Sequence, residues 1–205
     1  MNSEKFDNAK RVFTYEGYVD HIEALFEEGK VTGEVQSDQK LEATKINLHR
    51  IHRSDKTVKV VPELESKLKE LQEEMDWYLI TEGWCGDSAQ ITPVIAKVAA
   101  CNPKINFKLI LRDENPEIMD TYLTNGSRSV PKLVGVNINS GTESFIWGPR
   151  PTNIQERVVQ FKKDNPEVPH EEFLKNLHLW YGRDRGNAIQ EDFLKMLVEA
   201  PVSES

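Results

Sequence analysis

The stretch WYLITEGWCGDSAQITPVIAKVAAC, from Trp77 to Cys101, decides the fold. Its first part, WYLIT, is short, aromatic and β-branched, which predicts a buried strand. The part GDSAQITPVIAKVAAC predicts a helix, in which Pro93 is expected to produce a kink. Cys85 therefore falls where a strand ends and a helix begins. At a helix start, backbone N–H groups and the helix dipole lower the pKa of a thiol, so we expect a reactive thiolate there.

The segments after this stretch continue the alternation of strands and helices. INFKLILR predicts a second strand, and PEIMDTYLTNG predicts a helix that Gly126 closes. PKLVGVN and TESFIWG predict two strands joined by a hairpin turn at Asn139–Gly141, and TNIQERVVQFKK predicts a further helix. Strand–helix–strand order implies a central sheet with right-handed crossovers. The sequence thus predicts an α/β fold, with a central mixed sheet flanked by helices.

Helical patterns also surround this central part on both sides. Apolar residues recur at helical spacing in three N-terminal segments, of which the first ends at Gly29 and the third begins at Pro62. The residues concerned are Val19, Ile22, Leu25 and Phe26; Leu41, Ile46, Leu48 and Ile51; and Leu64, Leu68 and Leu71. Two more helices are expected around Phe173–Trp180 and Ile189–Val198. We therefore expect an N-terminal helical extension (1–55), a central domain (56–165) and a C-terminal helical extension (166–205), packed as one globular unit.

Composition excludes several classes of protein. The 205 residues are 38% hydrophobic and 29% charged, as expected of a globular protein, and the formal net charge of −8 argues against nucleic-acid binding. No apolar run is long enough to span a bilayer, and the charged start MNSEKFDNAK is not a secretory signal. Two cysteines sixteen positions apart do not make a disulfide framework. A reduced, cytoplasmic setting without membrane partners is the expectation.

Two motifs carry a resemblance to a known family. They are WCGDS, from Trp84 to Ser88, and SVPKL, in which Val130 and Pro131 open the first hairpin strand. Together with the element order they resemble the thioredoxin superfamily, which carries a cis-proline facing its active-site cysteine. The helical flanks, with NGSRSVPKL and WGPRP, resemble a little-characterised group of bacterial thioredoxin-like proteins. The resemblance implies a thioredoxin-like fold with Cys85 as nucleophile and Pro131 facing it. Beside them we expect a substrate groove formed by Trp84, Gly86, Val130, Pro131 and Arg128, although Trp84 could instead pack at the edge of the sheet.

The chain departs from the family pattern around the cysteine. Ser88 replaces the resolving cysteine, Asp87 replaces a frequent proline, and Leu79 stands where thioredoxins carry a buried acid. Ser88 could donate its hydroxyl to the sulfur, whereas the Asp87 carboxylate would disfavour a thiolate. Arg128 could offset Asp87, although an exposed loop arginine is the more common arrangement. We therefore assign Cys85, Ser88 and Asp87 to the catalytic site and expect no internal disulfide.

The other candidate residues indicate no metal or cofactor. Helical rise places Cys101 roughly 24 Å from Cys85, while a disulfide needs Cα atoms within about 7 Å, so we expect Cys101 to be an inert, largely buried thiol. His49 and His52 could share a helix face, but without a carboxylate or thiolate nearby a solvated face is favoured over a metal site. Trp77, Trp180 and Tyr181 are expected to pack in the core, and His21, His170 and His178 indicate no site.

Three functions remain open. The first is a single-cysteine thiol–disulfide oxidoreductase, in which Cys85 attacks a disulfide-containing protein or a disulfide of a low-molecular-weight thiol, and an external thiol resolves the product. The second is a non-catalytic module that binds an extended peptide beside Pro131. The third is iron–sulfur or glutathione binding, because CGDS resembles the Cys-Gly-Phe-Ser of monothiol glutaredoxins. We favour the first, with enzyme activity still to be established.

Overall fold

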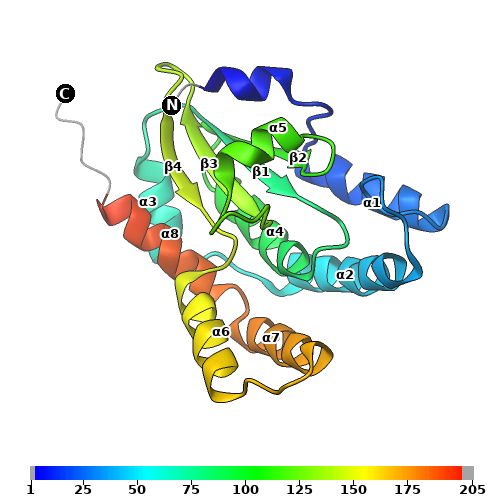
Figure 1. Cartoon of the computed structure of the whole chain (residues 1–205). Coiled ribbons are helices and arrows are strands. Elements are labelled where there is room, and N and C mark those ends of the chain that lie inside the picture. The colour runs from blue at the N-terminus through cyan, green and yellow to red at the C-terminus, as the bar shows by residue number, and fades with distance from the viewer. Residues whose placement is uncertain (1–2, 200–205) are drawn as a thin grey trace.

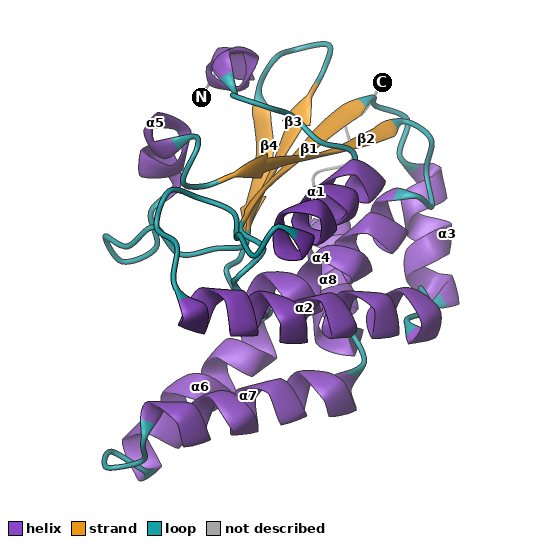
Figure 2. Cartoon of the chain, turned by 90° about the vertical axis from the view of Figure 1, so that its right-hand side faces the viewer, coloured by secondary structure: helices purple, strands orange, loops and turns teal. Residues whose placement is uncertain are grey.

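Four strands of the chain form one mixed sheet that carries helices on both faces (Figures 1 and 2). The computed structural model describes residues 3–199. In chain order its elements are η1 (Ser3–Asn8), α1 (Tyr15–Glu27), α2 (Asp38–Thr57), α3 (Pro62–Glu70), β1 (Met75–Thr81), α4 (Gly86–Ala99), β2 (Ile105–Leu111), α5 (Pro116–Met119), η2 (Asp120–Tyr122), β3 (Lys132–Asn137), β4 (Glu143–Trp147), α6 (Thr152–Asp164), α7 (His170–Asp184) and α8 (Asn187–Glu199).

The strand order is β2-β1-β3-β4. β1 and β2 are parallel and are joined by α4, while β3 runs antiparallel to both β1 and β4. Leu79 at the middle of the sheet faces Leu109 on one side and Leu133 on the other. The hairpin turn between β3 and β4 is stabilised by the side chain of Asn137, which accepts hydrogen bonds from the N–H groups of Asn139 (2.9 Å) and Ser140 (3.0 Å). The predicted α/β fold and hairpin are confirmed.

Strand β1 is buried on both faces, which explains its continuous apolar sequence. Trp77 and Leu79 point into the larger apolar cluster, formed with helices α1 to α4 and α6 to α8. Tyr78 and Ile80 point to the other face, where a smaller cluster includes Phe6 of η1. Figure 2 shows α2, α4, α6, α7 and α8 on one side of the sheet, with α5 and the N-terminal helical turn on the other. The end of β1 is therefore held firmly from two sides.

The N-terminal helices begin and end largely as their sequence predicts. Thr14 caps α1 by accepting from the N–H of Gly17, and Ser37 caps α2 by accepting from the N–H of Lys40. Gly29 follows α1 with φ +71°, a conformation that favours glycine. On α2, Leu48 and Ile51 are buried, but Ile46 is 43% exposed, so its expected place on the apolar face is wrong.

The helix expected over PEIMDTYLTNG is much shorter than predicted. It comprises α5, one turn long, and the 3-10 turn η2. Asn125 (φ +50°) and Gly126 (φ +75°) form a tight turn in which Thr124 and Ser127 exchange backbone hydrogen bonds. An Asn-Gly pair is a strong turn signal, and here it prevails over helical propensity.

Polar contacts anchor α8 to the end of β4, to the start of α6 and to the residue before α3. Asp192 of α8 accepts a hydrogen bond from the indole N–H of Trp147 (2.9 Å) and another from the backbone N–H of Thr152 (2.9 Å). Gln190 accepts from the backbone N–H of Val61 (2.7 Å). These contacts fix α8 against the start of α6 and, through the short connection at Gly186, fix α7 as well (Figure 1). The division into 1–55, 56–165 and 166–205 stays a prediction.

Over residues 3–199, none of the helices has both the length and the apolar character that crossing a bilayer requires.

Candidate active site

Cys85 lies at the turn between β1 and α4. It is the N-cap residue of α4, with an extended backbone (φ −80°, ψ 119°). Its N–H donates to the carbonyl of Glu82 (3.1 Å), and its carbonyl accepts from the N–H of Ala89 (3.1 Å), which begins the helix. The residue is partly exposed. The predicted placement of this sulfur at a strand-to-helix reversal agrees with the structure.

The loop before β3 faces the cysteine. The Val130–Pro131 peptide bond is cis, and the Cys85 thiol donates a hydrogen bond to the carbonyl oxygen of Val130 at 3.4 Å. Cys85 lines an open pocket of about 440 Å³. Its lining residues come from the two motif loops, the loop after β2 and the loop after β4: Trp84, Cys85, Asp87, Arg112, Asp113, Ser127, Arg128, Ser129, Val130, Pro149 and Arg150. Trp84, Val130 and Arg128 thus line one pocket with Cys85. Gly86 and Pro131 are not among the lining residues, but each directly follows one of them in the chain, Cys85 and Val130 respectively.

The pKa of the Cys85 thiol is raised, which contradicts the net lowering expected from the sequence. Burial of the sulfur is the largest cause, and the charge of Asp87 is the second. The Ser88 hydroxyl and the backbone N–H groups of Ser88 and Asp87 act in the opposite direction, as expected. Helix-start donors therefore do stabilise a thiolate here, but desolvation and the neighbouring carboxylate outweigh them.

Ser88 is almost completely buried in the first turn of α4. Only 1% of its surface is exposed, and its hydroxyl has no nitrogen or oxygen partner among the described residues. Its approach to the sulfur lowers the pKa of the Cys85 thiol. A hydroxyl otherwise without a partner is well suited to donate to a thiolate once one forms.

Asp87 is paired, but not with Arg128. Arg150 binds its carboxylate with two hydrogen bonds, Nη2 to Oδ2 at 2.7 Å and Nε to Oδ1 at 3.1 Å. The Tyr181 hydroxyl of α7 donates to Oδ1 at 2.8 Å. Arg128 instead forms an exposed pair with Asp120. The suggestion that Arg128 offsets Asp87 is therefore wrong. Arg128 is an exposed loop residue, which was the other alternative given for it.

Gly86 leaves room for the His178 side chain of α7. A Cβ atom at this position would lie 2.5 Å from Cε1 and 2.8 Å from Nε2 of His178. Burial, together with the charges of Arg50 and Arg150, lowers the pKa of His178 to about 4, so the ring that covers Gly86 is neutral at pH 7. His178 and Tyr181, which the sequence did not connect with the site, both reach it from the C-terminal extension.

Trp84, which lines the pocket, contacts two cations. The Lys40 ammonium is 4.4 Å from the centre of the indole, and the Arg112 guanidinium carbon is 4.8 Å from it. Both distances fit cation–π contacts. The indole N–H is buried and has no partner within the described chain. Trp84 is therefore held in place beside the sulfur rather than in the core.

A buried acid that the sequence analysis missed lies at the end of β1. Glu82 is completely buried, and burial raises its pKa to about 7. Its carboxylate accepts from the hydroxyl of Thr32 and from the backbone N–H of Asp113 (2.8 Å). Leu79, at the family's acid position, is buried within the sheet. An acidic residue directly after the apolar run WYLIT was the signal for this site.

The remaining candidate residues, His49, His52 and Cys101, belong to no metal-binding cluster in the described part of the chain. Within residues 3–199 no cluster of His, Cys, Asp and Glu has the composition to hold a metal ion, and His52 instead pairs with Glu23 (2.9 Å). Cys101 is partly exposed rather than largely buried, because it follows the last turn of α4 and bonds back to the carbonyl of Lys97 (3.4 Å). Cys101 is nevertheless separated from Cys85 by the whole length of α4.

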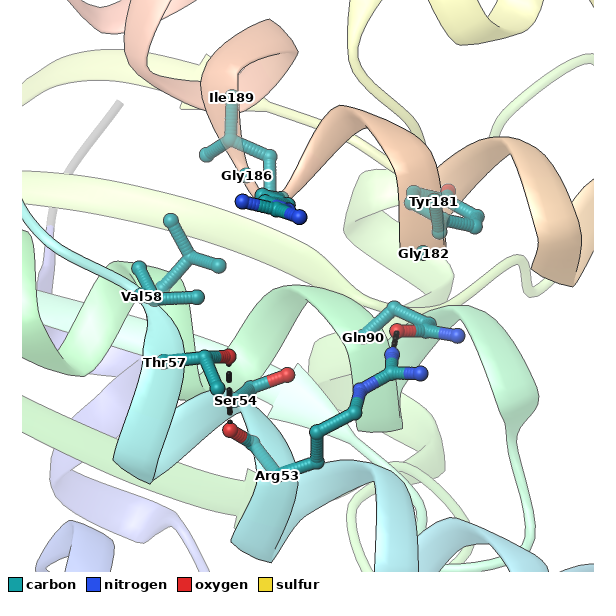
Figure 3. Close-up of a pocket in the computed structure, with 11 residues that line it drawn as sticks. Arg53, Ser54, Thr57, Val58, Gln90, Tyr181, Gly182, Gly186 and Ile189 are labelled. Atoms are coloured by element: carbon teal, nitrogen blue, oxygen red, sulfur yellow. Dashed lines mark hydrogen bonds between the residues drawn. The ribbon is translucent and has the colours of Figure 1, made fainter.

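A second cavity lies behind Tyr181, between α2, α4 and the α7–α8 connection (Figure 3). Arg53 crosses it to donate to the side-chain oxygen of Gln90 (3.1 Å). Its volume of about 30 Å³ is enough for about one water molecule and too small for a substrate. We attribute this cavity to imperfect packing where α2, α4 and the α7–α8 connection meet.

Residues 33–165 match the family model described as Thioredoxin. The chain belongs to this thioredoxin family. The matched segment contains both Cys85 and Pro131, whereas α7 and α8 lie beyond it. No curated protein matches the sequence.

Two solved structures share the fold. One is the crystal structure of an HIV epitope scaffold, with a TM-score of 0.56 and 14% identity over 97% of this chain and 98% of that one. The other is a protein of unknown function from Pseudomonas aeruginosa, with a TM-score of 0.57 and 14% identity over 97% of each chain. At this identity the likeness concerns the fold alone.

Proposed function

We propose that the protein is a thioredoxin-like monothiol thiol–disulfide oxidoreductase with Cys85 as its nucleophile. The observation that supports this most is the position of Cys85, whose sulfur lies at a helix start, 3.4 Å from the Val130 carbonyl, and which lines a pocket of about 440 Å³. A disulfide that enters this pocket meets the sulfur next to backbone donors of α4. Trp84 and Val130 would form the walls of the groove.

The reaction has two exchange steps. The Cys85 thiolate attacks one sulfur of a substrate disulfide, forms a new S–S bond and releases the other substrate sulfur as a thiolate. An external thiolate then attacks the substrate sulfur of this mixed disulfide and displaces the Cys85 thiolate. The proton of Cys85 passes to solvent water before the first step, which frees the Val130 carbonyl to accept from a peptide N–H of the substrate. Ser88 donates to the sulfur in its charged form.

The resolving thiol comes from outside the chain. Cys101 is the other cysteine, and the fourteen-residue helix α4 separates it from Cys85. At 1.5 Å per residue that helix is about 21 Å long, well beyond the reach of a disulfide. A low-molecular-weight thiol or a protein thiol in a reducing cytoplasm would complete the cycle.

One observation favours a second function, a non-catalytic module that binds a peptide beside Val130. The raised pKa of the Cys85 thiol leaves little thiolate at pH 7, which suits a binding site better than a fast enzyme. Pull-down of partners with Cys85→Ala separates the two. Partners that Cys85→Ala retains favour binding. Partners that the wild type retains in non-reducing buffer, and that Cys85→Ala loses under that condition only, favour exchange.

Trapping of mixed disulfides tests the proposed function directly. The wild type, Cys85→Ser and Cys101→Ser are incubated with a disulfide such as oxidised glutathione, and adducts are located by mass spectrometry of intact protein. The proposal expects an adduct at Cys85, reversed by added thiol, in the wild type and in Cys101→Ser but not in Cys85→Ser. The absence of an adduct at Cys85, with the protein folded and the oxidant in excess, would exclude exchange at this sulfur.

A further inference from the structure

Arg150 stands in the short loop between β4 and α6 and reaches across to the first turn of α4. It binds Asp87 through two nitrogen atoms, at 2.7 Å and 3.1 Å, with side chains only 23% and 11% exposed. A bidentate guanidinium–carboxylate pair fixes the direction as well as the distance of both groups. Both residues of the pair line the same pocket as Cys85.

Both partners of this pair are held by further hydrogen bonds. The remaining nitrogen of Arg150, Nη1, donates to the side-chain oxygen of Gln155 (3.2 Å) on α6. Oδ1 of Asp87 accepts from the Tyr181 hydroxyl (2.8 Å) on α7. Asp87 is therefore clamped from two elements, and its carboxylate has one orientation.

Among the described residues, the other charged and titratable groups around the cysteine do not balance Asp87 by contact. Arg112 and Arg128, which line the same pocket, pair with Asp113 (2.7 Å) and Asp120 (2.6 Å) instead. Arg50 of α2 donates to the side chain of Asn47 (2.8 Å), and burial lowers its pKa. His178 of α7 is neutral at pH 7, because its pKa lies at about 4. Tyr18 of α1 is buried against Thr81 (3.2 Å). Arg150 is thus the cation in contact with the carboxylate that opposes ionisation of the sulfur.

We propose that Arg150 is a positioning residue for Cys85, which holds the Asp87 carboxylate in place and balances its charge so that the sulfur can ionise beside it. The inference rests on the proposed role of Cys85 as nucleophile. Burial alone lowers the pKa of Arg150, yet the charges of Asp87, Tyr181 and Cys85 raise it overall. The same interaction must favour the thiolate, since coupling between two titrating groups is mutual.

The test is the pH dependence of alkylation of Cys85 by iodoacetamide, measured in a Cys101→Ser background so that one thiol reports. Arg150→Gln removes the balancing charge and should shift the midpoint upward by about one pH unit, which slows alkylation at pH 7 on the order of tenfold. Arg150→Lys retains the charge but not the two-point contact, and should shift it less. Arg183→Gln, an exposed arginine of α7, changes the net charge equally and should leave the midpoint unchanged.

The outcome that overturns the proposal is an unchanged midpoint in a folded Arg150→Gln protein, or a shift equal to that of Arg183→Gln. Circular dichroism establishes folding of each variant. If Arg150→Gln does not fold, Tyr181→Phe tests the same clamp by removing one hydroxyl, and unchanged midpoints in both Tyr181→Phe and Arg150→Lys refute it. Alkylation needs no disulfide substrate, so a failed trapping experiment and a failed midpoint shift are distinguishable.

Discussion

The buried carboxyl group of Glu82 is expected to make the stability of the protein depend on pH. The carboxyl group is fully buried just after the end of β1, and burial raises its pKa from an ordinary 4.5 to about 7, although the Thr32 hydroxyl and the N–H of Asp113 both donate to it. Glu82→Gln replaces the acid by a neutral group of almost the same shape. The variant should therefore remove a pH dependence that the wild type carries.

The sign follows from proton binding. Between pH 4.5 and about 7 the folded chain keeps the Glu82 proton that the unfolded chain has already lost, so the free energy of unfolding falls as pH rises through this window. At about 1.4 kcal/mol per pH unit, the full loss is about 3 kcal/mol. That is a large share of the 5–15 kcal/mol, roughly, by which most domains are stable. The difference is complete above pH 7.

Urea unfolding of the wild type and Glu82→Gln at pH 4.5, 6 and 8 measures it. The free energy of Glu82→Gln relative to wild type should rise by about 3 kcal/mol between the lowest and highest pH. Glu156→Gln, which removes an exposed acid of α6, should track the wild type. A relative free energy that is flat with pH, or that falls, would refute the argument that Glu82 is held protonated by burial.

Two more substitutions test the site. Asp87→Asn should speed alkylation of Cys85 at pH 7 several-fold, because it removes a charge that disfavours the thiolate and leaves the Arg150 charge unopposed; an equal or slower rate would contradict this. Gly86→Ala should destabilise the protein by about 1–3 kcal/mol in thermal or urea unfolding, because its Cβ would lie 2.5 Å from His178. Gly182→Ala is the matched control, since its Cβ would meet nothing closer than 3.7 Å; equal losses in both would mean that the His178 contact is not the cause.

Local patterns were sufficient for most of the fold. The strand ending at Thr81, the helix behind Cys85 and the hairpin at Asn137–Gly141 follow from periodicity and turn chemistry within a few residues. The Asn125-Gly126 pair shows where a competing local signal was underweighted, because its turn stopped a helix that apolar spacing had extended.

The site was less predictable because its charges come from distant parts of the chain. Arg150 and Tyr181 lie 63 and 94 positions after Asp87, and no local pattern connects them. The sign of the Cys85 shift depends on how deeply the sulfur is desolvated, which a sequence does not state. Glu82 was not predicted because the acid position of the family falls three residues earlier, at Leu79.

The docking of α7 on the first turn of α4 has a practical consequence for anyone who trims this protein to its family core. A fragment that stops at residue 165 would keep the cysteine and the proline turn but lose the Tyr181 donor and the His178 cover of Gly86. Asp87 would meet solvent, and screening by water would weaken its repulsion of the sulfur. The Cys85 thiol of the shortened protein would therefore differ in reactivity from that of the full chain, and assays on the fragment would not describe the full chain.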